Sequence, residues 1–224
     1  MNPPRSRPLS EALLASAGMV LFALFIHNGL PWGILSDLGL AATMLALLLS
    51  FRSERSAAGL LALAPFGRRA ALMAPSGAAL GIGLGLLFRW KFGLHWLPAG
   101  IGLFAPLAAA IGSAEELLYR GYIQGRLNRI NGLLAVTGAA AAHTAYKTAL
   151  FLLPALSLSN GPALSQSKAP VDLPVLAFWT FFGGLLFSAS RQGARNVLPP
   201  LAAHVAFDIV VYGELSRAPW WVWN

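Results

Sequence analysis

Long apolar runs separated by short polar or charged segments dominate the chain. The first three runs cover about residues 12–26, 34–51 and 70–88. A helix of about 17–25 apolar residues can cross the hydrocarbon core of a bilayer. The third run also carries four glycines, which allow a neighbouring helix to approach closely: Gly77, Gly81, Gly83 and Gly85. The pattern therefore predicts three membrane-spanning helices in the first part of the chain.

Four further apolar runs follow, at about residues 97–127, 133–153, 175–189 and 197–212. The run 97–127 is long for one span, so we expect tilt, a break near Gly112, or a tail that protrudes into the cytosol.

The segments between the runs also have recognisable compositions. Residues 56–67 are moderately apolar and bracketed by charges, which predicts a segment at the membrane surface. Residues 154–174 are rich in proline and serine and predict a loop. Three tryptophans near the C-terminus predict an anchor at the membrane interface: Trp220, Trp221 and Trp223.

Composition supports the same fold class. The 224 residues are 57% hydrophobic and only 11% charged, whereas a soluble domain is about 25% charged. The mean hydropathy is +0.64. We therefore predict an all-α polytopic transmembrane helix bundle of about seven spans (six to eight), forming a single membrane domain over residues 1–224. The chain has no cysteine, which excludes disulfides and thiol chemistry.

The basic residues predict the orientation in the membrane. With seven spans and a cytoplasmic N-terminus, ten basic residues fall on the cytoplasmic side and four on the far side. We attribute the net charge of +8 to loops that face anionic lipid, and we expect no nucleic acid partner. The short loops favour an integral protein of a prokaryotic inner (cytoplasmic) membrane.

Two adjacent glutamates end an uncharged apolar stretch. A carboxylate at bilayer depth costs about 2.5–3.5 kcal/mol, so Glu115 and Glu116 need a reason to be there. Arg120 lies four residues after Glu116 on the same helical face, so these two side chains can pair. Glu115 lies about 100° further round the helix. We interpret Glu116 as a structural carboxylate held by Arg120 and Glu115 as a carboxylate free for chemistry. A buried ion-pair cluster that only fixes the helix register is the alternative.

Two later runs contribute further ionisable groups. His143 and Lys147 lie in the run 133–153, and His204 and Asp208 lie in the run 197–212. Counted from the predicted cytoplasmic boundaries, these groups lie within roughly two helical turns of the depth of Glu115. We therefore expect them to share one cavity. His204 and Asp208 are four residues apart and share a helical face, whereas Lys147 is interpreted as a lysine that extends toward the membrane surface.

This set of groups suits the activation of water. Glu115 with His143 can remove a proton from a water molecule, and a neighbouring histidine can stabilise the oxyanion that forms. Glu115, His143 and His204 can equally hold a zinc ion. Both versions stay open from the residues alone.

The order of these motifs resembles a known family. Glu115-Glu116-x-x-x-Arg120, then His143, then His204-x-x-x-Asp208 after a glycine-rich span resembles the CPBP or Abi family of glutamyl intramembrane proteases, the CAAX proteases and bacteriocin-processing enzymes. The resemblance covers about residues 97–212, which would form the catalytic helix core.

The resemblance also implies roles for individual residues. It implies Glu115 as the general base, His143 as its partner, and His204 with Asp208 as the oxyanion-stabilising pair. Glu116 and Arg120 would support the site. Asparagine often stands at the position of Asp208 in the family, and Lys147 is outside the family pattern.

We therefore expect an intramembrane endopeptidase of glutamyl or metallo type that cleaves a peptide bond near the cytoplasmic membrane face. No cofactor is required for this activity, although zinc is allowed. The expected partners are a peptide or protein substrate and the lipid bilayer. The alternatives are a non-proteolytic immunity or scaffold protein of the same family and, less favoured, a proton-coupled transporter.

Overall fold

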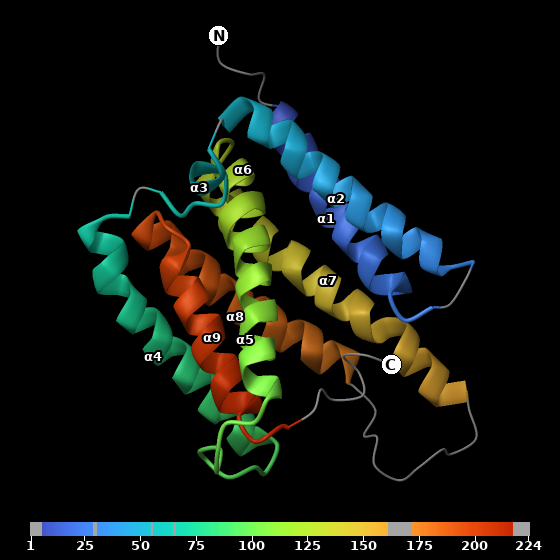
Figure 1. Ribbon diagram of the computed structural model, residues 1–224, viewed down its shortest axis with the longest axis vertical. Coiled ribbons are helices and arrows are strands. Elements are labelled where there is room, and N and C mark those ends of the chain that lie inside the picture. Colours follow the sequence, from blue (N-terminus) through green and yellow to red (C-terminus); the bar gives the residue numbers. More distant parts are fainter. Residues whose placement is uncertain (1–5, 29–30, 55, 65, 161–171, 217–224) are drawn as a thin grey trace.

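The computed structural model describes residues 6–28, 31–54, 56–64, 66–160 and 172–216. Every regular element in this part of the chain is helical, and none of it forms a strand. The predicted all-α fold class is thereby confirmed. Figure 1 shows the helices gathered in one bundle around α5.

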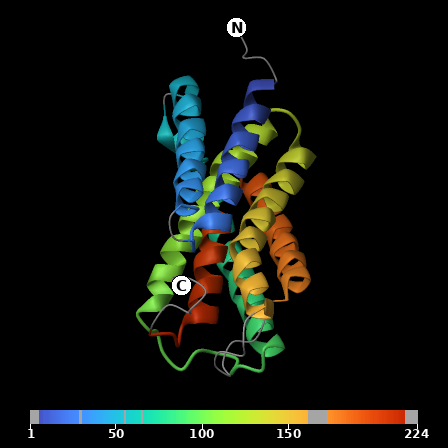
Figure 2. The same ribbon diagram turned by 90° about the vertical axis from the view of Figure 1, so that its right-hand side faces the viewer.

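The N-terminal helices form an antiparallel pair. Helix α1 (Ser6–Phe25) packs along α2 (Gly33–Glu54), and Figure 2 shows α1 between α2 and α7. The short α3 (Ala57–Leu60) and the long α4 (Arg68–Lys91) follow. These helices begin and end within a few residues of the apolar runs, except that α1 starts earlier. The location of residues 56–67 at the membrane surface stays a prediction.

Four helices are long and apolar enough to cross a membrane: Arg7–Phe25, Gly33–Glu54, Arg68–Lys91 and Leu173–Ala194. Leu198–Tyr212 is a shorter apolar helix. The molecule is therefore a helical membrane protein, while the span count and the cytoplasmic N-terminus stay predictions.

The middle of the bundle is a column of three consecutive helical segments. Helix α5 (Phe104–Glu116) continues as a π-helix, η1 (Leu117–Ile123), and then as α6 (Gln124–Asn128). The predicted single span 97–127 was wrong at its start, because the proline and glycines between residues 97 and 103 disfavour helix. Of the three alternatives for this long run, a break near Gly112 is not present, because α5 continues through that residue. The change in helix geometry comes at η1, directly after the two glutamates.

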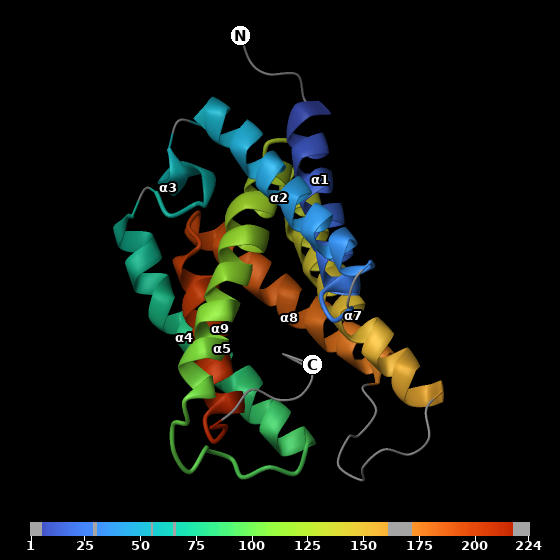
Figure 3. The same cartoon turned by 45° about the vertical axis from the view of Figure 1, so that its right-hand side comes forward.

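Three longer helices surround this column. They are α7 (Gly132–Asn160), α8 (Leu173–Ala194) and α9 (Leu198–Tyr212). Helix α8 contacts both α7 and α9, and Figure 3 shows it crossing behind α5 between them. The loop predicted for residues 154–174 was wrong for 154–160, where α7 continues and Ala155, Leu156 and Leu158 favour helix. Residues 161–171 and the three C-terminal tryptophans lie outside the described residues.

Close packing of α4 on α9 fixes the position of α9. A Cβ atom at Gly77 or Gly81 would collide with the main chain of α9, at Pro199 and Ala203. A Cβ at Gly85 would lie 2.8 Å from Val210. Three of the four glycines therefore allow the predicted close approach. Because α4 covers the face of α9 that carries Ala203, the next residue, His204, points toward α5.

Candidate active site

The structure brings together all the ionisable groups that the sequence predicted to share a cavity. Glu115 and Glu116 are the last two residues of α5, and Arg120 follows in η1. Helix α7 supplies His143 and Lys147, and α9 supplies His204 and Asp208. Apart from Lys147, whose side chain is 25% exposed, these residues are buried, and Glu116 and Arg120 are fully so.

Glu116 is the centre of a fully enclosed cluster. One of its oxygens, Oε1, accepts a hydrogen bond from Arg120 at 2.8 Å and lies 2.7 Å from Nδ1 of His204. The i,i+4 pair predicted from the sequence is therefore present. The contact with His204 was not predicted, and it shows that Glu116 ties η1 to α9.

Arg120 also fixes the protonation of His143. Its guanidinium lies 3.1 Å from Nδ1 of His143. A guanidinium only donates hydrogen bonds, so Nδ1 must accept and the ring proton sits on Nε2. Nε2 lies 3.2 Å from Oε2 of Glu115, to which it donates. The arginine thus presents an N–H of His143 to the neighbouring carboxylate.

Glu115 has two oxygens with different surroundings. Oε1 lies 2.5 Å from Nζ of Lys147. Oε2 faces Nε2 of His143 at 3.2 Å and Nε2 of His204 at 3.8 Å. The contact of Glu115 with His143 was expected, whereas its ion pair with Lys147 was not. The interpretation of Lys147 as a lysine extending to the membrane surface was therefore wrong. Lys147 lies one turn after His143 on the same face of α7, so it reaches the same carboxylate.

Asp208 holds His204 less closely than expected. The distance from its Oδ2 to Nε2 of His204 is 3.9 Å, which is too long for a hydrogen bond. Since Nδ1 of His204 faces the carboxylate of Glu116, that contact places the proton on Nδ1. Glu116, rather than Asp208, therefore orients His204, and Nε2 is left facing the centre of the site.

One residue of the site that the sequence reasoning missed is Gly112. A Cβ there would lie 2.5 Å from Oδ2 of Asp208 and 2.8 Å from Cδ2 of His204. Gly112 precedes Glu115 by three residues and lies on the same helical face. The sequence spacing of Gly112 and Glu115 could therefore have indicated that the glycine leaves space for α9 beside the glutamate.

Aromatic rings and unpaired polar atoms complete the surroundings. The ring of Tyr119 lies 4.7 Å from that of His143, and the ring of Phe187 lies 5.8 Å from that of His204. Oε2 of Glu116 and two nitrogens of Arg120 have no hydrogen-bond partner in the described part of the chain. Buried polar atoms rarely stay unpaired, so these atoms can still accept from or donate to buried water.

The side chains do not form a metal site as they are placed. Among the described residues, no group of three or more histidine, aspartate or glutamate side chains can hold a metal ion. Lys147 and Arg120 place positive charge directly on Glu115 and on His143, two members of the set suggested for zinc. These residues therefore do not fit a zinc ion, and the proposed mechanism uses none.

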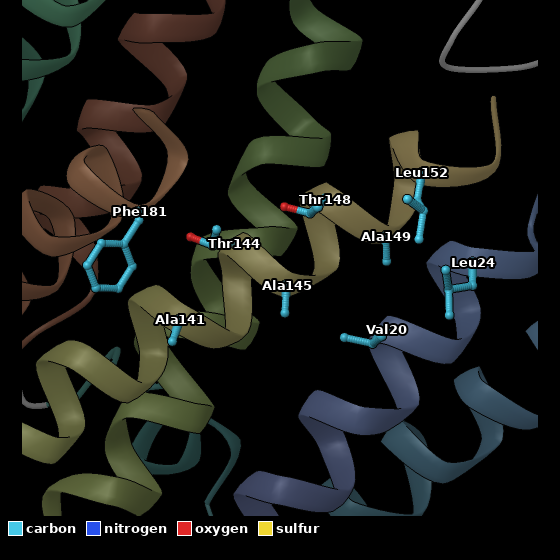
Figure 4. A pocket seen from close by; sticks show the side chains of 9 residues that line it. All are labelled: Val20, Leu24, Ala141, Thr144, Ala145, Thr148, Ala149, Leu152 and Phe181. Atoms are coloured by element: carbon cyan, nitrogen blue, oxygen red, sulfur yellow. The ribbon is translucent and has the colours of Figure 1, made fainter. Parts of the chain in front are cut away.

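A groove on the opposite face of α7 is separate from this site. It has a volume of about 490 Å³ and lies between α1, α7 and α8. Figure 4 shows small and apolar side chains around it, among them Ala141, Ala145, Val20 and Phe181. Its lining contains none of the ionisable residues that surround Glu115.

Comparison with known proteins supplies a family for this arrangement. A family model described as "Type II CAAX prenyl endopeptidase Rce1-like" matches residues 95–210, which include every ionisable residue of the site. Searches of curated proteins and of solved structures gave no match.

Proposed function

The chain belongs to the Rce1-like family of type II CAAX prenyl endopeptidases, and we propose that it hydrolyses a peptide bond within the membrane with Glu115 as general base. The observation that carries the proposal is the position of one oxygen atom. Oε2 of Glu115 lies between Nε2 of His143 and Nε2 of His204, while Oε1 is held by Lys147. One carboxylate oxygen is thereby aimed at the space between two imidazoles.

A water molecule bound beside Oε2 would be the nucleophile. The 3.8 Å between Oε2 and Nε2 of His204 is too long for a direct hydrogen bond and is a separation that water commonly bridges. Glu115 takes one proton from this water while the water oxygen attacks the peptide carbonyl carbon. Lys147 and His143 hold Glu115 ionised and oriented for this step.

The two remaining steps use His204 and the proton held by Glu115. The carbonyl oxygen becomes an oxyanion, to which His204, protonated on both nitrogens and anchored through Nδ1 by Glu116, donates from Nε2. Glu115 then returns its proton to the amine nitrogen as the carbon–nitrogen bond breaks. Asp208 lies 3.9 Å from Nε2 of His204 and balances its positive charge.

The same proposal includes the setting of the reaction. Residues 97–212 form the catalytic helix core of a single membrane domain. The substrate is a peptide or protein at the membrane, cleaved near the cytoplasmic face of a prokaryotic inner membrane. Glu116 and Arg120 position the two histidines without touching the substrate.

Cleavage of a co-expressed peptide library in membranes tests the proposal. We expect wild-type cleavage with and without a zinc chelator, and none with Glu115→Gln protein that is inserted and folded. Cleavage abolished by the chelator would overturn the metal-free mechanism. Cleavage and cellular phenotypes that are unchanged in Glu115→Gln would favour the non-proteolytic immunity or scaffold alternative.

A further inference from the structure

Two groups of arginines near the α6 end of the bundle have different surroundings. In the first group, Glu11 of α1 and Glu54 of α2 together pair with Arg7, Arg126 and Arg129. Arg126 lies 3.4 Å from Glu11 and 3.0 Å from Glu54. Glu11 also pairs with Arg7 at 3.0 Å, and Glu54 also pairs with Arg129. Every arginine of this group thus has a carboxylate partner within the chain.

The second group, Arg191 and Arg195 at the end of α8, has no such partner. Arg191 is in the last turn of α8, and Arg195 follows one turn later as its C-cap. Within the described part of the chain, no carboxylate lies within 4 Å of either guanidinium. Arg191 makes no hydrogen bond there, although it is 8% exposed, and its Nε is buried without a partner.

These arginines line a polar pocket of about 350 Å³. The other lining residues are Asn128 of α6 and Gln192 of α8, which hydrogen-bond to each other at 2.9 Å. Arg191 as a residue is more than nine-tenths buried, and its Nε is fully so. The pocket thus combines two positive charges, two amide side chains and no negative charge.

A buried, unpaired guanidinium is costly, because an isolated charge loses its hydration without gaining a partner. Arg191 does not recover this cost by capping α8, since it donates to none of the last carbonyls of the helix. Water in the pocket would hydrate the guanidinium but leave its charge unbalanced. The missing partner must therefore be an anion from outside the described chain.

The position of the pocket indicates the source of that anion. Arg191 and Arg195 lie at the end of Leu173–Ala194, a helix apolar enough to span the membrane. The end of such a helix lies at the depth of lipid headgroups. Guanidinium groups bind phosphate with paired, charge-assisted hydrogen bonds, and basic pockets between helices bind lipid headgroups.

We propose that Arg191 and Arg195, with Asn128 and Gln192, form a binding site for the phosphate group of an anionic membrane lipid. The site lies outside the group of ionisable residues around Glu115, so it does not depend on the proposed peptidase activity. The lipid supplies the negative charge that Glu11 and Glu54 supply to the other group of arginines.

The test uses the full chain in detergent, with phosphatidylglycerol, phosphatidylcholine or inorganic phosphate as the added probe. Thermal unfolding and native mass spectrometry report stabilisation and bound lipid. Arg191→Gln and Arg195→Gln are compared with the double variant Arg68→Gln/Arg69→Gln. The control arginines are exposed and begin α4 at the same end of the bundle.

We expect phosphatidylglycerol to stabilise the wild type more than phosphatidylcholine does. Each Gln variant at the pocket should lose about tenfold in affinity for phosphatidylglycerol, and the control should lose little. Without lipid, Arg191→Gln should be at least as stable as the wild type, because an unpaired charge has been removed.

Several outcomes would overturn the proposal. Equal phosphatidylglycerol binding by the wild type and Arg191→Gln would do so, as would equal stabilisation by inorganic phosphate, which would identify an ion from solution. Unfolding of Arg191→Gln without lipid would reveal a partner within the chain. A raised KM for peptide with unchanged lipid binding would assign the arginines to a substrate carboxylate instead.

Discussion

Glu115 and Glu116 are neighbours in sequence but occupy two different regions of the site. Glu116 is fully buried, and its Oε1 contacts Arg120 and His204, both held inside the bundle. Glu115 faces His143 and a lysine whose side chain is 25% exposed. The Glu116 region is closed and joins helices, whereas the Glu115 region connects with the outside through Lys147.

The difference shows how one helix supports two functions. Successive residues on a helix point about 100° apart, so adjacent carboxylates enter different environments. Glu116, enclosed with Arg120, holds the helices in register. Glu115, which contacts α7 and faces His204 across 3.8 Å, has room to act on a water molecule. The two adjacent glutamates therefore combine a structural and a proposed chemical carboxylate.

The largest expected effect is on the rate, at Glu115. Glu115→Gln should lower kcat about 10²–10⁴-fold, because the amide cannot accept the proton of water. KM should change little, since Glu115 is not proposed to bind the ground state of the substrate. Single-turnover cleavage in detergent or membranes measures both. A variant Glu115→Asp, which keeps a carboxylate one methylene shorter, should fall between wild type and Glu115→Gln.

On the Glu116 side the expected effect is on stability. Arg120→Met removes one partner of a fully buried pair and should destabilise the fold by about 3–5 kcal/mol. The double variant Glu116→Leu/Arg120→Met should regain most of that loss, because apolar residues often replace a buried pair without cost. Its cleavage activity should stay low, since both histidines lose their anchor. Full activity of a stable double variant would refute the positioning role.

Gly112→Ala tests how much the rate depends on the position of His204 and Asp208 in α9. The added methyl group would lie 2.5 Å from Asp208 and 2.8 Å from His204. A displacement of about 1 Å at a catalytic group can cost about 10²-fold in rate. Gly183→Ala in α8 is the matched control, because a Cβ there meets nothing within 4 Å. Equal activity of the two variants would show that α9 adjusts freely.

Replacing Lys147 should change kcat by less than the substitutions of Glu115 and Gly112. Lys147→Met should lower kcat about tenfold, the loss expected when one charge-assisted hydrogen bond that orients Glu115 is removed. Lys147→Arg keeps the charge and should recover part of the rate. A change confined to KM would instead assign Lys147 to substrate binding.

The smallest effect is expected far from the site, at the end of α9. Glu214 accepts hydrogen bonds from the backbone N–H of Ala99 at 2.8 Å and from Arg89 at 2.9 Å. These groups, Ala99 first, hold the pKa of Glu214 below its ordinary value of 4.5. The stability that this contact contributes is therefore present at neutral pH and is lost as the pH falls below about 4.5.

Glu214→Gln should accordingly reduce thermal stability slightly at pH 7, and the difference from wild type should shrink toward pH 3. Cleavage at pH 7 should be unchanged, because Glu214 follows the end of α9 and makes no contact with the ionisable residues around Glu115. A pH-independent difference in unfolding temperature would contradict the assignment. This variant also controls for nonspecific losses in the site variants.

The lengths and positions of the apolar runs were enough to predict most of the helices. The ends of α2, α8 and α9 lie within a few residues of their apolar runs, because helix length in a membrane follows hydropathy. The π-helix η1 was not predictable in this way, since its geometry depends on contacts with other helices. The helical extension of α7 over residues 154–160 was masked by the proline content of the segment.

In the candidate site too, some contacts could be predicted from the sequence and others could not. Pairs within one helix, such as Glu116 with Arg120, follow from i,i+4 spacing alone. Pairs between helices do not, because they depend on the rotation of each helix about its axis. The contacts of Glu115 with Lys147 and of Glu116 with His204 are of this kind. The roles of these residues in catalysis stay predictions.

The most direct measurement compares Glu115→Gln with Glu116→Gln, using cleavage and thermal unfolding on the same purified samples. Glu115→Gln should lose cleavage while its unfolding temperature stays close to that of the wild type. Glu116→Gln should unfold at a clearly lower temperature and keep measurable cleavage below that temperature. The reverse result, with a destabilised Glu115→Gln that still cleaves and an intact Glu116→Gln that does not, would contradict the assignment of Glu115 as the general base.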